Sequence, residues 1–165
     1  MKTVSYIIEC LERTPVILQS LINQIPEDLY KTTRVEDKWS IHEQVCHLVD
    51  AQEILVGRFR KFQHEENPLI KSYLPPEGRD SDHYLNLDMQ EALEKFPIIR
   101  KEMIEMLRGF DQTYWSRQGR HEAFDPYNTV LLLTHSLNVD YAHLFSIEQL
   151  GLTKEGLEHE IMTIP

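Results

Sequence analysis

The chain has 165 residues, with 27 acidic and 17 basic side chains and a formal net charge of −10. This length and an apolar content of 41% predict a single domain with one hydrophobic core and exclude intrinsic disorder. The acidic balance and the lack of a sizeable Lys/Arg cluster argue against nucleic acid and anionic membranes as partners.

Cysteine content and hydropathy indicate a compartment. Cys10 and Cys46 are too few for a disulfide framework, and the first ten residues lack the basic start and apolar run of a signal peptide. The longest aliphatic run covers residues 130–133, far below the roughly 18 residues that span a bilayer. We therefore expect a soluble, cytoplasmic protein.

Apolar residues recur at helical spacing in four long blocks, without sustained alternation, which predicts an all-α domain. In the first block, a short segment ends near Leu11. Thr14 and Pro15 are then predicted to be the N-cap and first-turn proline of a restarted helix, which Pro26 ends.

The second block begins at a predicted capping box, in which Ser40 is followed three residues later by Glu43. A helix is therefore expected to start near Ser40. Its core-facing stripe is predicted to contain Ile41, Val45, Leu48, Gln52, Leu55, Phe59 and Phe62.

The remaining elements complete a bundle. Residues 67–88 are rich in proline and charge and predict a crossover, which a third helix from Met89 to Gly109 follows, kinked at Pro97. Asn128 opens a fourth helix that reaches about Leu150, with Gly151 as its C′ residue. We predict a four-helix bundle over residues 1–151, with a long crossover between helices 2 and 3 and a polar tail over residues 152–165.

Three of the eight histidines stand out because they lie on or beside apolar helix faces: His47, His135 and His143. From spacing alone, a hydrogen-bonded core histidine is the favoured interpretation of each. His135 and His143 are about 12 Å apart along their helix and cannot share one metal ion. Asp140, three residues before His143, is the candidate carboxylate for an ion shared with His143.

Other catalytic templates are not met. The sequence has no nucleophile elbow, phosphate loop, Cys-x-x-Cys motif or His-Glu-x-x-His motif. Cys46 and His47 are sequence neighbours on a helix and point about 100° apart, which argues against a thiolate nucleophile.

Several short motifs occur in a familiar order: Pro26-Glu27-Asp28-Leu29, Lys38-Trp39-Ser40-Ile41, His47-Leu48-Val49-Asp50-Ala51 and Leu131-Leu132-Leu133-Thr134-His135, followed by Asp140, His143, Leu144 and Ile147. Together they resemble the signature of the DinB-like (damage-inducible) family, which includes bacillithiol S-transferases. The similarity extends from about Thr14 to Gly151.

The resemblance implies a four-helix bundle, often dimeric, that holds zinc or nickel with three histidines. One ligand position matches His47, and the His-x-x-x-His pair of the last helix maps onto Val139 and His143. Asp140 or water is one candidate for the missing ligand, His135 is another if the helix is distorted, and a vacant site is the third alternative.

Two functions follow from the resemblance. The leading hypothesis is a metal-dependent thiol S-transferase or hydrolase, in which the ion lowers the pKa of a bound low-molecular-weight thiol or water. The alternative is a non-catalytic binding or interaction bundle with a degenerate metal site. Asp50 and Tyr141 are expected beside the site, Asp50 either orienting His47 or exposed to solvent, and Trp39 is expected to pack mainly as a hydrophobic staple.

Overall fold

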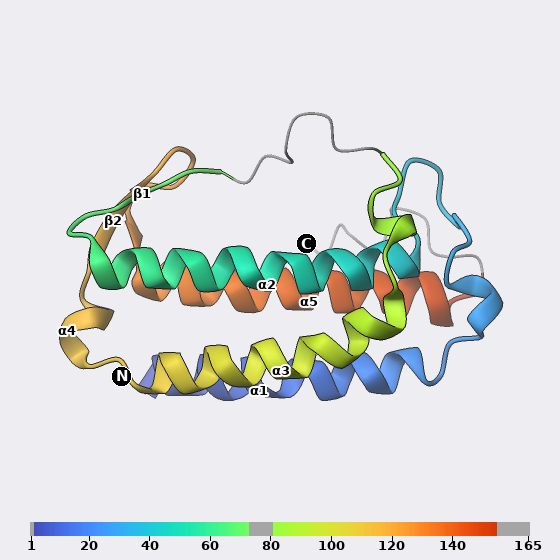
Figure 1. Ribbon diagram of the computed structural model, residues 1–165, viewed down its shortest axis with the longest axis horizontal. Coiled ribbons are helices and arrows are strands. Elements are labelled where there is room, and N and C mark those ends of the chain that lie inside the picture. Colours follow the sequence, from blue (N-terminus) through green and yellow to red (C-terminus); the bar gives the residue numbers. More distant parts are fainter. Residues whose placement is uncertain (1, 73–80, 155–165) are drawn as a thin grey trace.

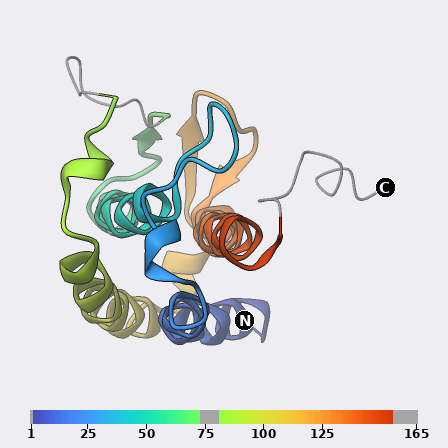
Figure 2. The same cartoon turned by 90° about the vertical axis from the view of Figure 1, so that its right-hand side faces the viewer.

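Four long helices form the body of the protein in a computed structural model that describes residues 2–72 and 81–154. They are α1 (Lys2–Ile22), α2 (Ile41–His64), α3 (Met89–Arg108) and α5 (Thr129–Leu152). Seen end-on in Figure 2, they occupy the corners of a square. α1 packs on α3 and α5, and α2 packs on the same two helices. The predicted four-helix bundle is confirmed.

Short elements join the long helices. These are the 3-10 helices η1 (Glu27–Leu29) and η2 (Tyr84–Asn86), the one-turn helix α4 (Gln112–Trp115), and the strands β1 (Leu69–Ile70), β2 (Gln118–His121) and β3 (Tyr127–Asn128). β1 pairs with β2 in parallel, and β2 pairs with β3 antiparallel, at the end of the bundle where α2 ends and α5 begins. The strands were not predicted, because two to four residues are too few to show alternation.

α1 is one continuous helix, so the predicted restart at Thr14 and Pro15 is wrong. Pro15 has no N–H to donate to Leu11 O, four residues earlier. Thr14 Oγ1 lies 2.9 Å from that carbonyl oxygen and can donate to it. A side-chain hydroxyl thereby compensates for the bond that proline removes, and the helix continues.

The start of α2 is as predicted. Ser40 accepts from the N–H of Glu43, while Glu43 Oε2 accepts from the N–H of Ser40 at 2.8 Å. Every residue of the predicted core stripe of α2 is buried. His42 on the first turn of α2 is also buried, with Nε2 2.9 Å from Leu87 O.

The last two long helices also follow the prediction in most respects. α3 continues across Pro97 and ends at Gly109, and Asn128 caps the N-terminus of α5. Gly151, however, lies inside α5 rather than beyond it. A Cβ there would overlap Ile25, so this glycine is required for close packing and not for a C-cap. The predicted crossover and tail lie partly outside the described residues, at 73–80 and 155–165.

The hydrophobic core has two parts, one toward each end of the bundle. Between them every long helix contributes one fully buried polar side chain: Thr14, Gln52, Arg100 and Asp140. A polar layer therefore crosses the centre of the bundle. No described helix is both long enough and apolar enough to cross a membrane.

Candidate metal centre

His47 and His143 face each other between α2 and α5. Their ring centroids are 4.9 Å apart, and both side chains are half-buried. The two residues are 96 positions apart in the chain and meet because α2 and α5 pack side by side (Figure 2). The structure thus brings together the two histidines that the resemblance selected.

The tautomer of His47 follows from its hydrogen bonds. Nδ1 of His47 lies 2.9 Å from the hydroxyl of Tyr84, and that hydroxyl donates to Asp50 Oδ2 at 3.2 Å. Since the single hydroxyl proton points to Asp50, the phenol oxygen accepts from Nδ1–H of His47. The proton on Nδ1 places the lone pair of the ring on Nε2.

His143 is held in the same tautomer. Its Nδ1 lies 2.6 Å from Oε1 of Gln44, an acceptor, so Nδ1 carries the proton and Nε2 the lone pair. Burial, assisted by the nearby His47, lowers the pKa of His143 to about 4. The imidazole is therefore neutral at neutral pH, which is the form that coordinates a metal.

Trp39 covers this pair. Its ring centroid lies 4.6 Å from that of His47, 6.4 Å from that of His143 and 5.4 Å from that of Tyr84. Trp39 remains 37% exposed, so one edge of the indole meets solvent. The structure places Trp39 against the histidines, whereas the sequence favoured a hydrophobic staple.

The donor set fits part of a divalent metal site. Imidazoles suit zinc and nickel, and a coordinating histidine usually donates its other N–H to an oxygen acceptor, as both rings do here. Within residues 2–72 and 81–154, however, no group of three or more His, Cys, Asp or Glu side chains is arranged to hold an ion. Val139 occupies the position one turn before His143, where a third ligand is expected.

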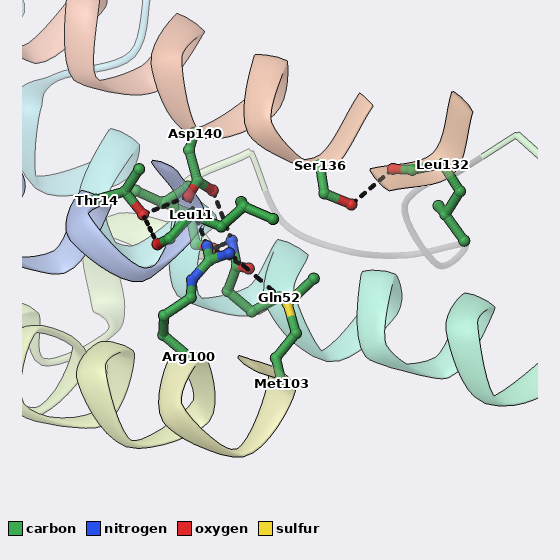
Figure 3. Close-up of polar contacts among 9 residues, drawn as sticks. Leu11, Thr14, Gln52, Arg100, Met103, Leu132, Ser136 and Asp140 are labelled. Carbon is green, nitrogen blue, oxygen red and sulfur yellow. Dashed lines mark hydrogen bonds and ion pairs between the residues drawn. The ribbon is translucent and has the colours of Figure 1, made fainter. Parts of the chain in front are cut away.

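Asp140 belongs to the polar layer rather than to the histidine pair. As Figure 3 shows, its Oδ2 accepts from Arg100 Nη2 at 2.6 Å and lies 2.6 Å from Thr14 Oγ1, and its Oδ1 accepts from Gln52 Nε2 at 3.1 Å. Burial raises the pKa of Asp140, and Arg100 opposes that shift. The expectation that Asp140 joins His47 and His143 around one ion does not match this geometry, because both of its oxygens are engaged in the core.

Of the other predicted residues, Asp50 lies near the His47–His143 pair, whereas His135 and Tyr141 do not contact its rings. Asp50 accepts a hydrogen bond from the Tyr84 hydroxyl, which in turn contacts His47. This arrangement matches the expected alternative in which Asp50 orients His47. His135 packs beside Phe124, with ring centroids 5.9 Å apart, and Tyr141 is 44% exposed. Neither has a ring contact with the histidine pair. Burial raises the pKa of the Cys46 thiol to about 11, so Cys46 is no thiolate nucleophile.

Sequence reasoning missed Tyr84, Gln44 and Arg100. Tyr84 lies in a connection without periodicity, so no local pattern indicates that it reaches His47. Arg100 was detectable, because it falls between the buried Phe96 and Met103 at helical spacing, which is a core position.

Comparisons with known proteins agree with the fold. The chain matches an Oceanobacillus iheyensis protein, whose name proposes a metal-dependent hydrolase, at 24% identity over 111 residues that cover 67% of this chain. The match spans 64% of the relative's own length. The solved structure of YfiT from Bacillus subtilis superposes with a TM-score of 0.73. Its description proposes a metal-dependent hydrolase and reports an unusual four-helix bundle topology. That alignment has 18% identity and covers 88% of this chain and 86% of YfiT.

A family model also matches most of the chain. The model of the DinB superfamily matches residues 11–144, which include both histidines of the α2–α5 pair and most of all four long helices. The chain belongs to the DinB superfamily.

Proposed function

We propose that this protein is a metal-dependent hydrolase whose reaction centre is the His47–His143 pair. The observation that carries the proposal is the shared tautomer of the two rings. Each Nδ1–H is held by an oxygen, so both rings carry their lone pair on Nε2. The names of the two relatives support a metal-dependent hydrolase of this fold.

Each residue of the centre has a distinct role. His47 and His143 are the protein ligands, and a divalent ion held by them would lower the pKa of water, to about 7 in the case of zinc. Gln44 and Tyr84 fix the orientation of the rings. Asp50 accepts a hydrogen bond from the Tyr84 hydroxyl, which orients the phenol oxygen to accept from Nδ1–H of His47. Trp39 shields one side of the pair from water.

Metal titration tests the proposal directly. The protein is purified without a histidine tag, stripped with a chelator and titrated with zinc and with nickel. His47→Gln and His143→Gln should each weaken binding by about tenfold or more, since each removes one bond between the ion and the protein. His135→Gln is the matched control, because His135 lies elsewhere on α5. Equal affinity in all four proteins would refute the site.

One observation favours a second candidate, a binding protein without turnover. Because position 139 is a valine, the described residues offer no histidine one turn before His143, and fewer protein ligands hold an ion more weakly. Activity assays of the metal-loaded protein distinguish the two candidates. One assay tests hydrolysis of a panel of esters and amides, and the other tests transfer of a low-molecular-weight thiol to an electrophile. Hydrolysis lost in His143→Gln supports the hydrolase, and thiol transfer lost in the same variant identifies an S-transferase. Metal binding without either reaction identifies the binding protein.

A further inference from the structure

A second cluster of polar side chains lies where the strands meet the bundle. Arg58 on α2 donates from Nη2 to Lys71 O at 3.0 Å, and Lys71 directly follows Ile70, which is in register with His121 of β2. The ring centroid of His121 is 4.8 Å from that of Tyr127 of β3. Arg58, His121 and Tyr127 therefore come together from three elements.

His135 joins the cluster from α5. Phe124 packs against both histidines. Its ring centroid is 5.0 Å from that of His121 and 5.9 Å from that of His135. His135 lies eight residues before His143 on the same helix, which is about 12 Å along the axis. The cluster is therefore separate from the α2–α5 histidine pair.

The cluster is rich in donors. Nδ1 of His121 accepts from the N–H of Ala123 at 3.0 Å, so the ring proton is on Nε2. Tyr127 is only 3% exposed, and its hydroxyl has no hydrogen-bond partner among the described residues. A buried hydroxyl without a partner costs free energy that a ligand with an acceptor atom recovers.

Arg58 contributes a positive electrostatic potential at the cluster. Burial is the largest cause that lowers the pKa of His121 and of His135, and Arg58 lowers both further. Burial raises the pKa of Tyr127, and Arg58 opposes that rise, so the cation acts on all three groups. Glu122 acts in the opposite sense on His121, but its Oε2 already accepts from the N–H of Ser72 at 3.0 Å.

We propose that Arg58, His121, Tyr127 and His135 form a binding site for a small anion, a phosphate or carboxylate group. The guanidinium supplies charge, Tyr127 and His121 supply neutral donors, and His135 borders the site beside Phe124. Guanidinium groups bind both kinds of anion with charge-assisted hydrogen bonds. The site does not depend on a metal at His47 and His143.

The test uses the metal-free full chain and two probes, inorganic phosphate and acetate. Binding is measured by calorimetry and by the ring resonances of His121 and His135. Arg58→Gln and Tyr127→Phe should each weaken binding by about tenfold or more, because each removes a donor. Arg60→Gln is the matched control, since Arg60 is an exposed arginine on the same helix. Saturable binding of phosphate alone, or of acetate alone, identifies the class of anion.

Two results would overturn the proposal. The first is the absence of saturable binding of either probe at millimolar concentration. The second is a Tyr127→Phe variant that unfolds at a higher temperature but binds the anion as tightly as the natural chain does. In that case the buried hydroxyl only destabilises the fold and takes no part in binding. Because Arg58→Gln also loses the bond to Lys71, its thermal unfolding is compared with that of Arg60→Gln. Tyr127→Phe keeps the ring and decides the outcome if Arg58→Gln does not fold.

Discussion

Asp140 and His143 lie one turn apart on α5 but serve different parts of the molecule. Asp140 points into the bundle, where Arg100 Nη2 donates to its Oδ2 at 2.6 Å, whereas the ring of His143 lies 4.9 Å from that of His47. The buried ion pair links α5 to α3 across the centre of the bundle. The rotation of the helix that satisfies this pair is the rotation that presents His143 to α2.

The buried pair predicts a large loss of stability when it is broken. Asp140→Asn leaves the Arg100 guanidinium buried without its counter-charge, which should lower the free energy of unfolding by about 3–5 kcal/mol in urea denaturation. Glu12→Gln is the matched control, since Glu12 pairs with Arg108 at the same 2.6 Å but about half exposed. That control should cost much less, because an exposed ion pair contributes little to stability. Similar losses in the two variants would contradict the role of the core pair.

Tyr84 is predicted to act on the metal site through His47. Tyr84→Phe removes the oxygen that accepts from Nδ1–H, so metal affinity should fall by about tenfold or more. Tyr30→Phe is the control, because it also removes a tyrosine hydroxyl with a hydrogen bond, to Ile22 O, away from the histidines. If both variants bound metal as the natural chain does, Tyr84 would have no part in orienting the ligand.

Val139→His should complete the pair of ligands on α5. The substitution places a second imidazole one turn before His143, and chelation by a third histidine should tighten zinc binding by about tenfold or more. Calorimetric titration of the stripped protein measures the change, with Asn138→His on the neighbouring, exposed position as the control. A gain in the control but none in Val139→His would show that position 139 does not face the site.

The lowered pKa of His143 predicts a pH-dependent stability. Because the group titrates near 6.5 when unfolded and about 4 when folded, the unfolded chain binds the extra proton between these values. The contribution of His143 to folding is therefore complete above about pH 6.5 and declines as the pH falls toward 4. Urea unfolding of the metal-free protein at about pH 5 and about pH 7 measures this decline. The decline should be smaller in His143→Gln, and an equal decline in both proteins would contradict the assignment.

Local signals predicted most of the helices. The Ser40–Glu43 box set the start of α2 and Asn128 the start of α5, because a cap involves residues three positions apart at most. The predicted restart at Pro15 was wrong. The proline pattern indicates a helix start, but the contact of the Thr14 hydroxyl with Leu11 O lets the helix continue through Pro15. The homodimer and the cytoplasmic location stay predictions.

The candidate site was only half predictable. His47 and His143 could be selected by their matched positions, but their partners Tyr84 and Gln44 lie in a connection and on α2, without any pattern that pairs them with histidines. Asp140 was selected by its distance from His143 along the helix, and the structure instead pairs it with Arg100. Distance along a helix says which side chains are near one another, and not which neighbouring helix each one faces.

The sequence by itself determined the four long helices, the starts of α2 and α5 and the superfamily, because periodicity and capping are local and survive in any arrangement of the helices. The tertiary structure alone decided which side chains meet. α5 carries apolar residues on most of its circumference, and Asp140 and Glu148 are the only Asp, Glu, Lys or Arg residues in it. Amphipathicity therefore does not fix the rotation of α5 about its own axis. The buried pairing of Asp140 with Arg100 sets that rotation, and the rotation in turn brings His143 close to His47.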